Sequence, residues 1–439
     1  MAKNENNRGS PDLEYSDEEV LNYHENNYPG HGKIEIIPKT PVISQRDLTL
    51  AYSPGVAVPC LEIQKKPIDL YKYTNIANTI AVISNGTRIL GLGDIGIAGY
   101  PVMEGKSILF KALANVDAFP LILSNYDPDS FISTVKSISQ NFAGINLEDI
   151  QKPDCFLIER TLEKELDIPV FHDDQWGTAV VTLAGILNSL KLVDKNIDDV
   201  NIVMNGSGAS GIAITHMLLD AGVKGTNIQT VDRIGTIYSG RGAMDMYKEE
   251  LSTRINPKKL SLSLSEAVEG ADILIGASSP GAFTKDMIKS MQNDAIVFAI
   301  ANPDPEILPK HAIAAGATVV GTGRSDFPNQ INNVLGFPGI FRGLLDVRAK
   351  KVTNNMKVAA ANAIASMTPE EDLTPDNIIT SPTDPQLMAT EAAAVAKAAI
   401  KDNVARKIIS DEKIYELTLK RIEYYQKIFA PTVKSRKIN

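Results

Sequence analysis

The sequence predicts an α/β fold made of two successive sheet-forming regions, and three observations indicate it. From about residue 79 onward, short β-rich runs alternate with helical stretches, which is typical of a mostly parallel sheet covered by helices. A second series of apolar runs begins near residue 200, and each run ends in small or polar residues. A glycine-rich turn follows the first run of that series, where a doubly wound sheet carries a ligand-facing loop.

The size and composition are those of an ordinary globular chain with more than one domain. The 439 residues exceed the size at which one hydrophobic core remains efficient, so we expect two domains or three. Hydrophobic residues make up 44% and charged residues 22%, and the net charge of -9 argues against nucleic acid as a main partner. No apolar run approaches the roughly 18 residues of a membrane span, so we expect no membrane partner.

The cysteines and the N-terminal sequence indicate the compartment. Neither Cys60 nor Cys155 has the spacing of a zinc site or a redox motif, and we interpret both as small buried apolar residues. The polar, acidic N-terminus lacks the apolar core of a signal peptide. A reducing, cytoplasmic location is therefore expected.

The first region contains three predicted strands and a predicted helix. The helical stretch is "GKSILFKALANV", between the first two strands. The predicted strands lie at residues 79–84 ("TIAVIS"), 119–124 ("FPLILS") and 168–174 ("IPVFHDD").

The second region contains five predicted strands, and helices lie on either side of it. A long helix and a polar connection over residues 179–199 precede it, and Ala-rich helices follow after about residue 350. The predicted strands begin the segments "VNIVMNGSG", "NIQTVDR", "ADILIGAS", "AIVFAIANP" and "ATVVGTG".

The glycine-rich turn predicts a dinucleotide site. Gly206, Gly208 and Gly211 form GxGxxG directly after a predicted strand and directly before a predicted helix, as the phosphate loop of a Rossmann fold requires. Asp232 ends the next strand, where an acid binds the ribose hydroxyls of NAD. Arg233 beside it could accept the 2′-phosphate of NADP, so NAD is favoured and NADP remains open. The expected cofactor-binding residues are Gly206, Ser207, Gly208, Ala209, Ser210, Gly211, Asp232, Arg233 and Asn302.

Two pairs of adjacent acids predict a cation site. Asp173 and Asp174 follow the last strand of the first region, and Glu148 and Asp149 lie in "GINLEDI". Adjacent carboxylates in a cleft need a counter-charge, and ligation by Glu148, Asp149 and Asp174 would select a hard cation such as Mg²⁺ or Mn²⁺. Taken alone, Asp174 could also be only an N-cap of the following helix.

Three further residues accompany the acids. Tyr52 lies in a Pro-Gly turn, and Arg88 and Lys106 lie in one segment with the motif "GLGDIGIAGYPVMEGK". Taken singly, Tyr52 could be structural, Lys106 a surface lysine and Asn302 a turn residue. Their joint occurrence in order favours a catalytic interpretation.

Six motifs together resemble a known family. In chain order they are "YSPGVAVPC", "TRILGLGDIGIAGYPVMEGK", "GINLEDI", "IPVFHDDQWGTA", "GRSDFPNQINNVLGFPGIFRG" and "LDVRA". The chain resembles the short bacterial and archaeal malic enzymes over roughly residues 16 to 405. The resemblance implies oxidative decarboxylation of L-malate to pyruvate and CO₂ with a nicotinamide cofactor and a divalent metal.

The resemblance also implies a role for each site residue. Tyr52 is the expected acid and Lys106 the expected base, with Asp173 as the partner of the lysine. Glu148, Asp149 and Asp174 are the expected metal ligands. The expected substrate-binding residues are Arg88, Asn302 and Asn333.

These roles imply a sequence of proton transfers. With a pKa lowered by burial and by the nearby cation, Lys106 would take the C2 hydroxyl proton while hydride leaves for the nicotinamide. After CO₂ loss, Tyr52 would protonate C3 of the enolate.

The domain organisation follows from the two regions and the resemblance. We expect an N-terminal α/β substrate and catalytic domain at residues 16–175 and a Rossmann-type NAD(P)-binding domain at 176–380. Helices at 381–430 are expected to pack on the body or on a partner. The resemblance implies a homodimer that uses the C-terminal helices and the N-terminal segment as contacts.

Some alternatives remain open at this point. Trp176 stands where many short malic enzymes have a second histidine, and it could narrow the pocket or pack against the next helix. The same scaffold could act as an oxaloacetate decarboxylase or a malolactic enzyme. An alternative of another class is a nucleotide-responsive binding protein without catalytic activity.

Overall fold

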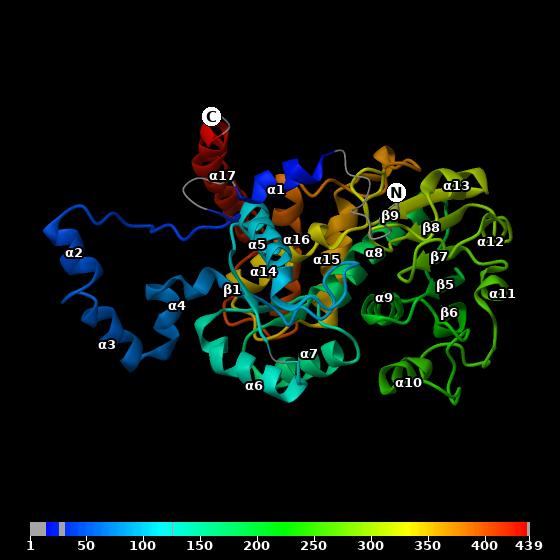
Figure 1. The fold of residues 1–439 in the computed structure, drawn as a ribbon, viewed down its shortest axis with the longest axis horizontal. Helices are drawn as coiled ribbons and strands as arrows, with labels where there is room; N and C mark the ends of the chain where they lie inside the picture. Colours follow the sequence, from blue (N-terminus) through cyan, green and yellow to red (C-terminus); the bar gives the residue numbers. More distant parts are fainter. Residues whose placement is uncertain (1–14, 26–30, 125, 437–439) are drawn as a thin grey trace, which may run out of the picture.

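The computed structural model describes residues 15–25, 31–124 and 126–436, and it contains two parallel sheets. The predicted α/β fold is confirmed, with both sheets covered by helices (Figure 1). Among the described residues, no helix combines the length and apolarity that crossing a membrane requires.

The first sheet has four strands in the order β2-β1-β3-β4. Strand β3 is missing from the sequence prediction, because three residues are too few to show an alternation of side chains. Helix α1 (Asp17–Glu25) precedes this unit. The strands are β1 (Thr79–Ser84), β2 (Asp117–Ile122), β3 (Ile145–Leu147) and β4 (Val170–His172). The helices between them are η3 (Gly96–Gly99), α5 (Tyr100–Ala114), α6 (Pro128–Ile138), η4 (Ser139–Asn141) and α7 (Asp154–Glu165).

The register of this sheet brings the acids together. Leu147 at the end of β3 pairs with Ile83 of β1 on one side and with His172 of β4 on the other. Parallel strands in this register end at one edge, so the residues that follow β3 and β4 emerge side by side. Glu148 and Asp173 are those residues.

The second sheet has five parallel strands in the order β6-β5-β7-β8-β9, one of the two common orders of doubly wound nucleotide-binding sheets. Strand β5 lies at the point where the order reverses. The strands are β5 (Ile202–Asn205), β6 (Ile228–Val231), β7 (Ile273–Gly276), β8 (Ala295–Ala299) and β9 (Ala317–Thr322). The helices are α9 (Ala209–Asp220), η5 (Gly225–Asn227), α10 (Met246–Ser252), α11 (Leu264–Val268), α12 (Lys285–Lys289) and α13 (Pro309–Ala314).

Helix α8 (Asp173–Leu192) connects the two sheets and packs against α9 and α15. After β9 the chain returns to the first unit, where α14 packs on α5. Rings of Phe337 and Phe341 lie 4.6 and 5.3 Å from the ring of Phe110. The remaining helices are η6 (Asn333–Leu335), α14 (Phe337–Asp346), α15 (Asn354–Ser366), η7 (Glu370–Asp372), α16 (Pro385–Lys401) and α17 (Asp411–Arg436).

The domain limits that the sequence suggests, at 175/176 and 380/381, remain a proposal. Helix α14 already belongs in space to the first unit, because it packs on α5, and α16 and α17 also contact α5. Helices α14, α16 and α17 therefore pack on the first unit, whereas α15 packs against α8 and α9.

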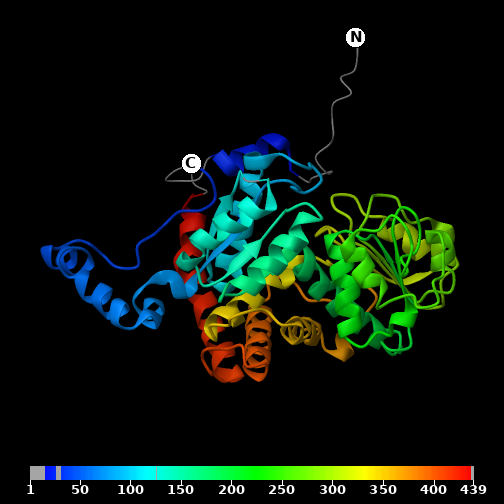
Figure 2. The ribbon, with the colours of Figure 1, turned by 90° about the horizontal axis from the view of Figure 1, so that it is seen from below.

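The segment from residue 40 to 78, which we call the arm, projects from the body (Figures 1 and 2). None of the residues in its α-helices is buried. Cys60 is exposed there, so the prediction that both cysteines are buried is wrong for Cys60 and confirmed for Cys155. The arm consists of α2 (Gln45–Ala51), α3 (Ala57–Lys65), η1 (Pro67–Asp69), α4 (Leu70–Tyr73) and η2 (Asn75–Asn78).

Candidate active site

Lys106 lies between two acids at the carboxyl edge of the first sheet. Its Nζ is 2.6 Å from Oδ2 of Asp173 and 3.0 Å from Oε1 of Glu148. The helix that carries it, α5, places the ammonium 4.2 Å from the centroid of the Phe337 ring. Asp173 is fully buried, so this ion pair is largely withdrawn from solvent. The structure thus brings together the predicted lysine and its predicted aspartate.

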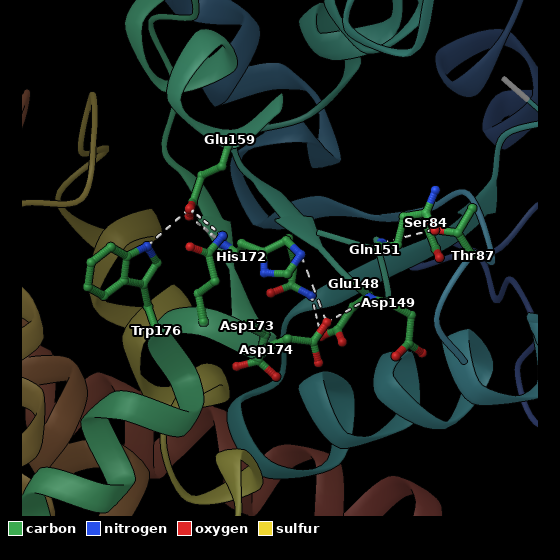
Figure 3. A network of polar contacts seen from close by, with 12 residues as sticks. Ser84, Thr87, Glu148, Asp149, Gln151, Glu159, His172, Asp173, Asp174 and Trp176 are labelled. Carbon is green, nitrogen blue, oxygen red and sulfur yellow. Dashed lines mark hydrogen bonds and ion pairs between the residues drawn. The ribbon is translucent and has the colours of Figure 1, made fainter. Parts of the chain in front are cut away.

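Asp149 and Asp174 form a second pair of acids in the same cluster as Glu148 and Asp173 (Figure 3). The backbone N–H of Asp149 donates to Oδ2 of Asp174 over 2.8 Å, and Asp149 has a φ of 52°. Glu148 accepts from Nδ2 of Asn146 over 2.8 Å. Helix α8 begins at Asp173, so both aspartates lie in its first turn, where the helix dipole favours negative charge.

The pKa values of Glu148, Asp149 and Asp173 reflect a shortage of positive charge. Burial raises the pKa of Glu148 well above its ordinary value, although Lys106 opposes this. Burial and the neighbouring Asp174 raise the pKa of Asp149 to about 8. Burial also raises the pKa of Asp173. Another cation in this cluster would relieve the repulsion among the carboxylates.

Burial alone would lower the pKa of Lys106, but Asp173 and Glu148 outweigh burial and raise it above the ordinary value. The prediction that burial and a nearby cation together lower this pKa stays a prediction. The negative charge of the acids therefore affects the pKa of Lys106 more than its apolar surroundings do.

The donor set fits a hard divalent cation by its chemistry, since it offers carboxylate oxygens. Within the described residues, however, no three Asp, Glu, His or Cys side chains are arranged to hold a metal ion. Glu148 is directed to Lys106 and Asn146, and Asp174 is directed to the N–H of Asp149. Carboxylate rotation would be needed for Glu148, Asp149 and Asp174 to share one ion.

Of the three predicted substrate-binding residues, Asn333 and Arg88 lie close to the cluster of acids. Nδ2 of Asn333, at the start of η6, donates to Oδ2 of Asp173 over 2.6 Å. Arg88 acts electrostatically on Asp149, and its Nη1 lies 3.9 Å from the position of a Cβ on Gly208. Arg88 therefore lies between the acids and the glycine-rich turn. Asn302 is exposed in the loop after β8, where Pro303 approaches the Arg88 loop at Gly91.

Tyr52 lies apart from the cluster within the single chain. It is 70% exposed at the end of α2, on the arm that Figures 1 and 2 show projecting away from α5 and α8. The chain alone therefore does not bring Tyr52 to Lys106, and its role remains a prediction.

The glycine-rich turn has the close backbone approaches that its sequence predicts. A Cβ on Gly211 would lie 2.1 Å from the carbonyl oxygen of Gly206, and Gly206 has a φ of 123°. Gly208 is the N-cap of α9, and no side chain caps that helix. Its first N–H groups are thus available to a phosphate. Nζ of Lys152 reaches the carbonyl of Ser207 over 3.2 Å.

The acid at the end of β6 is held by two cations that the sequence prediction does not include. Asp232 accepts from Nη1 and Nη2 of Arg241 over 2.9 and 2.6 Å, and from Nζ of Lys248 over 2.8 Å. Although burial opposes it, these bonds hold the pKa of Asp232 well below its ordinary value. Arg241 and Lys248 lie within 16 residues of Asp232 in the sequence, but only the fold shows that both bind its carboxylate.

A nucleotide-type sheet whose glycine-rich turn faces a lysine and carboxylate cluster defines a nicotinamide-nucleotide-dependent oxidoreductase. Residues 176–401 match the family domain described as "Malic enzyme, NAD binding domain", and residues 31–127 match "Malic enzyme, N-terminal domain". The chain belongs to the malic enzyme family.

Curated relatives and solved structures agree with this assignment. The chain is 50% identical to the "Bifunctional malic/malolactic enzyme" of Bacillus subtilis over 92% of its own length and 98% of that protein. It is 52% identical to the "NAD-dependent malic enzyme" of Geobacillus stearothermophilus, over 86% of this chain and 78% of that protein. For the "NADP-dependent malic enzyme" of Escherichia coli the identity is 46%, over 95% of this chain and 56% of that longer relative.

The fold also matches the malic enzyme of Pyrococcus horikoshii with a TM-score of 0.92. The two sequences are 49% identical, over 95% of this chain and 98% of that chain. The NAD-dependent malic enzyme of Thermotoga maritima gives a TM-score of 0.80 at 45% identity, over 83% of this chain and 96% of that chain.

Proposed function

We propose that this protein catalyses the oxidative decarboxylation of L-malate to pyruvate and CO₂ with a nicotinamide nucleotide. The observation that carries the proposal is the placement of Lys106 between Asp173 and Glu148, at the sheet edge that faces the GxGxxG turn. A base must lie beside the alcohol from which hydride departs, and a nucleotide-binding turn must lie across from it.

We propose Lys106 as the general base for the C2 hydroxyl. Proton transfer from a hydroxyl needs the neutral amine, so the charge of the surrounding acids must be offset for Lys106 to act. Glu148, Asp149 and Asp174 are the proposed holders of Mg²⁺ or Mn²⁺. When bound, this ion would supply Lewis-acid stabilisation of developing negative charge. Arg88, Asn302 and Asn333 are proposed to bind and orient the substrate.

The basic test follows absorbance at 340 nm with malate, Mn²⁺ and each nicotinamide nucleotide in turn. Malate-dependent reduction of the nucleotide with equal formation of pyruvate is expected. CO₂ release from oxaloacetate without malate oxidation would instead favour the decarboxylase. Lactate from malate without net nucleotide reduction would favour the malolactic reaction, which the name of the Bacillus subtilis relative makes the second candidate. Binding of nucleotide without any turnover would refute an enzymatic function.

We further propose a homodimer in which the arm of one copy delivers Tyr52 to the site of the other. The arm exposes large apolar side chains, with Ile36 just before it 84% and Ile43 within it 88% exposed. Apolar surface on this scale is typical of an interface. Beside the site, Leu90 and Leu92 of the Arg88 loop are also exposed and offer an apolar surface to receive it.

Mixed dimers test this arrangement. Tyr52→Phe and Lys106→Ala chains, each inactive alone and carrying different tags, are combined and the heterodimer is purified. If the tyrosine acts across the interface, one site carries both changes and the other carries neither, so the heterodimer regains roughly half of the wild-type activity. A heterodimer as inactive as its parents would show that each Tyr52 serves its own chain. A chain that stays monomeric at assay concentrations would rule out the dimer.

We propose NAD as the preferred nucleotide and NADP as a second one. Asp232 favours a ribose with a free 2′-hydroxyl, while Arg241 and Lys248 offset its charge. Asp232→Asn should raise the ratio of kcat/KM for NADP over NAD by at least tenfold, about 1.4 kcal/mol, because two cations lose their carboxylate.

The control for this variant is Asp198→Asn, which removes an exposed acid from the same region and should leave the ratio unchanged. Initial rates with both nucleotides at saturating malate give the ratio. A wild-type protein that already prefers NADP tenfold would mean that Arg233, Arg241 and Lys248 decide the choice.

The cytoplasm remains the proposed location. Its support is chemical: Cys60 and Cys155 are both free thiols, and Cys60 is exposed, which suits a reducing compartment.

A further inference from the structure

A buried carboxylate lies behind the turn that carries Asp173 and Asp174. Glu159 of α7 is 5% exposed, and its Oε1 accepts from the backbone N–H of His172 over 2.8 Å. Its Oε2 accepts from Nε2 of Gln175 over 2.9 Å and from Nε1 of Trp176 over 3.1 Å. Figure 3 shows Glu159 on one side of this turn and the carboxylates of the site on the other.

The residues that donate these three hydrogen bonds lie directly before and directly after Asp173 and Asp174 in the sequence. His172 ends β4 and is the N-cap of α8, and its own side chain does not cap the helix. Gln175 and Trp176 follow Asp174 in the first turn of α8. Glu159 therefore holds the chain immediately before and immediately after the two aspartates, and it accepts the backbone N–H of the N-cap residue His172.

Trp176 links Glu159 to a buried cation. Nζ of Lys357, on α15, lies 3.2 Å from the centroid of the indole ring, and Lys357 is 6% exposed. The same indole donates its N–H to Glu159. Burial raises the pKa of Glu159 to about 7, and Lys357 opposes that rise. Burial lowers the pKa of Lys357 to about 8, and Glu159 opposes that fall.

We propose that Glu159 is a positioning residue, supported by Trp176 and Lys357, that fixes Asp173 against Lys106 and Asp174 beside Asp149. The proposal rests on the function proposed for that site. It also explains the orientation of Trp176, whose indole N–H points to Glu159 and away from the carboxylates of the site (Figure 3). Its ring faces Lys357.

A carboxylate is the group that this arrangement requires. Three N–H donors converge on Glu159, and an ionised carboxylate can accept all of them, whereas an amide offers one acceptor oxygen and two hydrogens of its own. Burying the charge is costly unless it is hydrogen-bonded and balanced, and the chain balances it with Lys357.

The first test replaces Glu159 with Gln in the full-length protein. The amide must turn its NH₂ toward at least one donor, which displaces the turn and the two aspartates. We expect Mn²⁺ binding, measured as free Mn²⁺ by electron paramagnetic resonance, to weaken roughly 10- to 100-fold. The kcat should fall to a similar degree, while the KM for the nucleotide stays unchanged. Glu165→Gln, an exposed acid on the same helix paired with Lys136, is the matched control.

The second test separates charge from packing. In Lys357→Met, Glu159 loses its cation, so its pKa rises and it ionises only at higher pH. The kcat of this variant should therefore recover as the pH is raised from 7 to 9, whereas Glu159→Gln should not recover. The other charged groups that face this pair are Glu163 of α7 and Asp220 of α9, which both remain, and the buried imidazole of His172 stays neutral.

The chain contains a single tryptophan, Trp176, so its fluorescence reports on this site in metal-free protein. Glu159→Gln should shift the emission maximum, and Glu165→Gln should not. If Glu159→Gln proves too unstable to purify, Trp176→Phe is the alternative variant. It removes the indole N–H that donates to Glu159 but keeps an aromatic ring beside Lys357. It should weaken Mn²⁺ binding by a smaller factor than Glu159→Gln.

The outcomes distinguish this proposal from the function it rests on. A wild type that neither binds Mn²⁺ nor oxidises malate would refute the proposed function. An active wild type, together with a Glu159→Gln variant that loses thermal stability but keeps wild-type Mn²⁺ affinity and kcat, would overturn the positioning role. The same conclusion would follow if Trp176→Phe and Lys357→Met had no effect on either quantity.

Discussion

Lys106→Ala is expected to slow hydride transfer from malate by about 10²- to 10⁴-fold, the usual contribution of a positioned acid or base. Lys106 is the cation held against both Asp173 and Glu148, so its removal also leaves two buried carboxylates without their partner. Single-turnover mixing with NAD, Mn²⁺ and malate, followed at 340 nm and by pyruvate assay, should show little of either product.

Tyr52→Phe should give a different pattern in the same experiment. If the tyrosine protonates C3 after decarboxylation, reduced nucleotide should form faster than pyruvate, with the final protonation slowed by a factor on the order of 10² to 10⁴. Tyr73→Phe, on α4 of the same arm, is the matched control and should behave as wild type. Equal loss of both signals in Tyr52→Phe would mean that the tyrosine acts before or during hydride transfer.

Asp174→Ala is expected to abolish decarboxylation of malate while nucleotide binding persists. Its carboxylate is one of three proposed metal ligands and accepts the N–H that orders Asp149. Removing it takes one negative charge from the cluster and frees the Asp149 backbone. Isothermal titration with NAD and, separately, with Mn²⁺ measures the two sites independently, and only the Mn²⁺ affinity should be lost.

The control for the metal site lies on the same helix. Lys191→Ala changes a charged residue at the far end of α8 and should preserve Mn²⁺ binding and turnover. Wild-type activity in excess chelator, or an Asp174→Ala variant as active as wild type, would remove the metal assignment.

The site could be predicted from the sequence where neighbouring residues carry the chemistry. GxGxxG between a strand and a helix is a local pattern, and the approach of a Cβ on Gly211 to the Gly206 carbonyl follows from it. The acids could be found as two adjacent pairs, Glu148 with Asp149 and Asp173 with Asp174, because adjacent carboxylates in a cleft need a counter-charge. The pairing of Lys106 with Asp173, whose Nζ and Oδ2 atoms lie 2.6 Å apart, was expected from the family resemblance.

Other features depend on contacts between distant segments, which no local pattern encodes. Strand β3 is too short to show periodicity, and it exists because β1 and β4 pair with it on both sides. The pKa of Lys106 depends on how many acids the fold places around it, and Asp173 and Glu148 outweigh the effect of burial. Arg241 and Lys248 reach Asp232 because the chain after β6 folds back.

By itself, the sequence determined the fold class and the glycine-rich turn, because both depend on residues close together in the chain. It also predicted the acids as adjacent pairs, and the family resemblance added the proposed role of Lys106. Only the tertiary structure decided where Tyr52 lies, which helices cover the first sheet and what holds the two aspartates in place. The physical reason is that Glu159, Trp176 and Lys357 come from three different helices. Their hydrogen bonds and balanced charge arise only when α7, α8 and α15 are packed together.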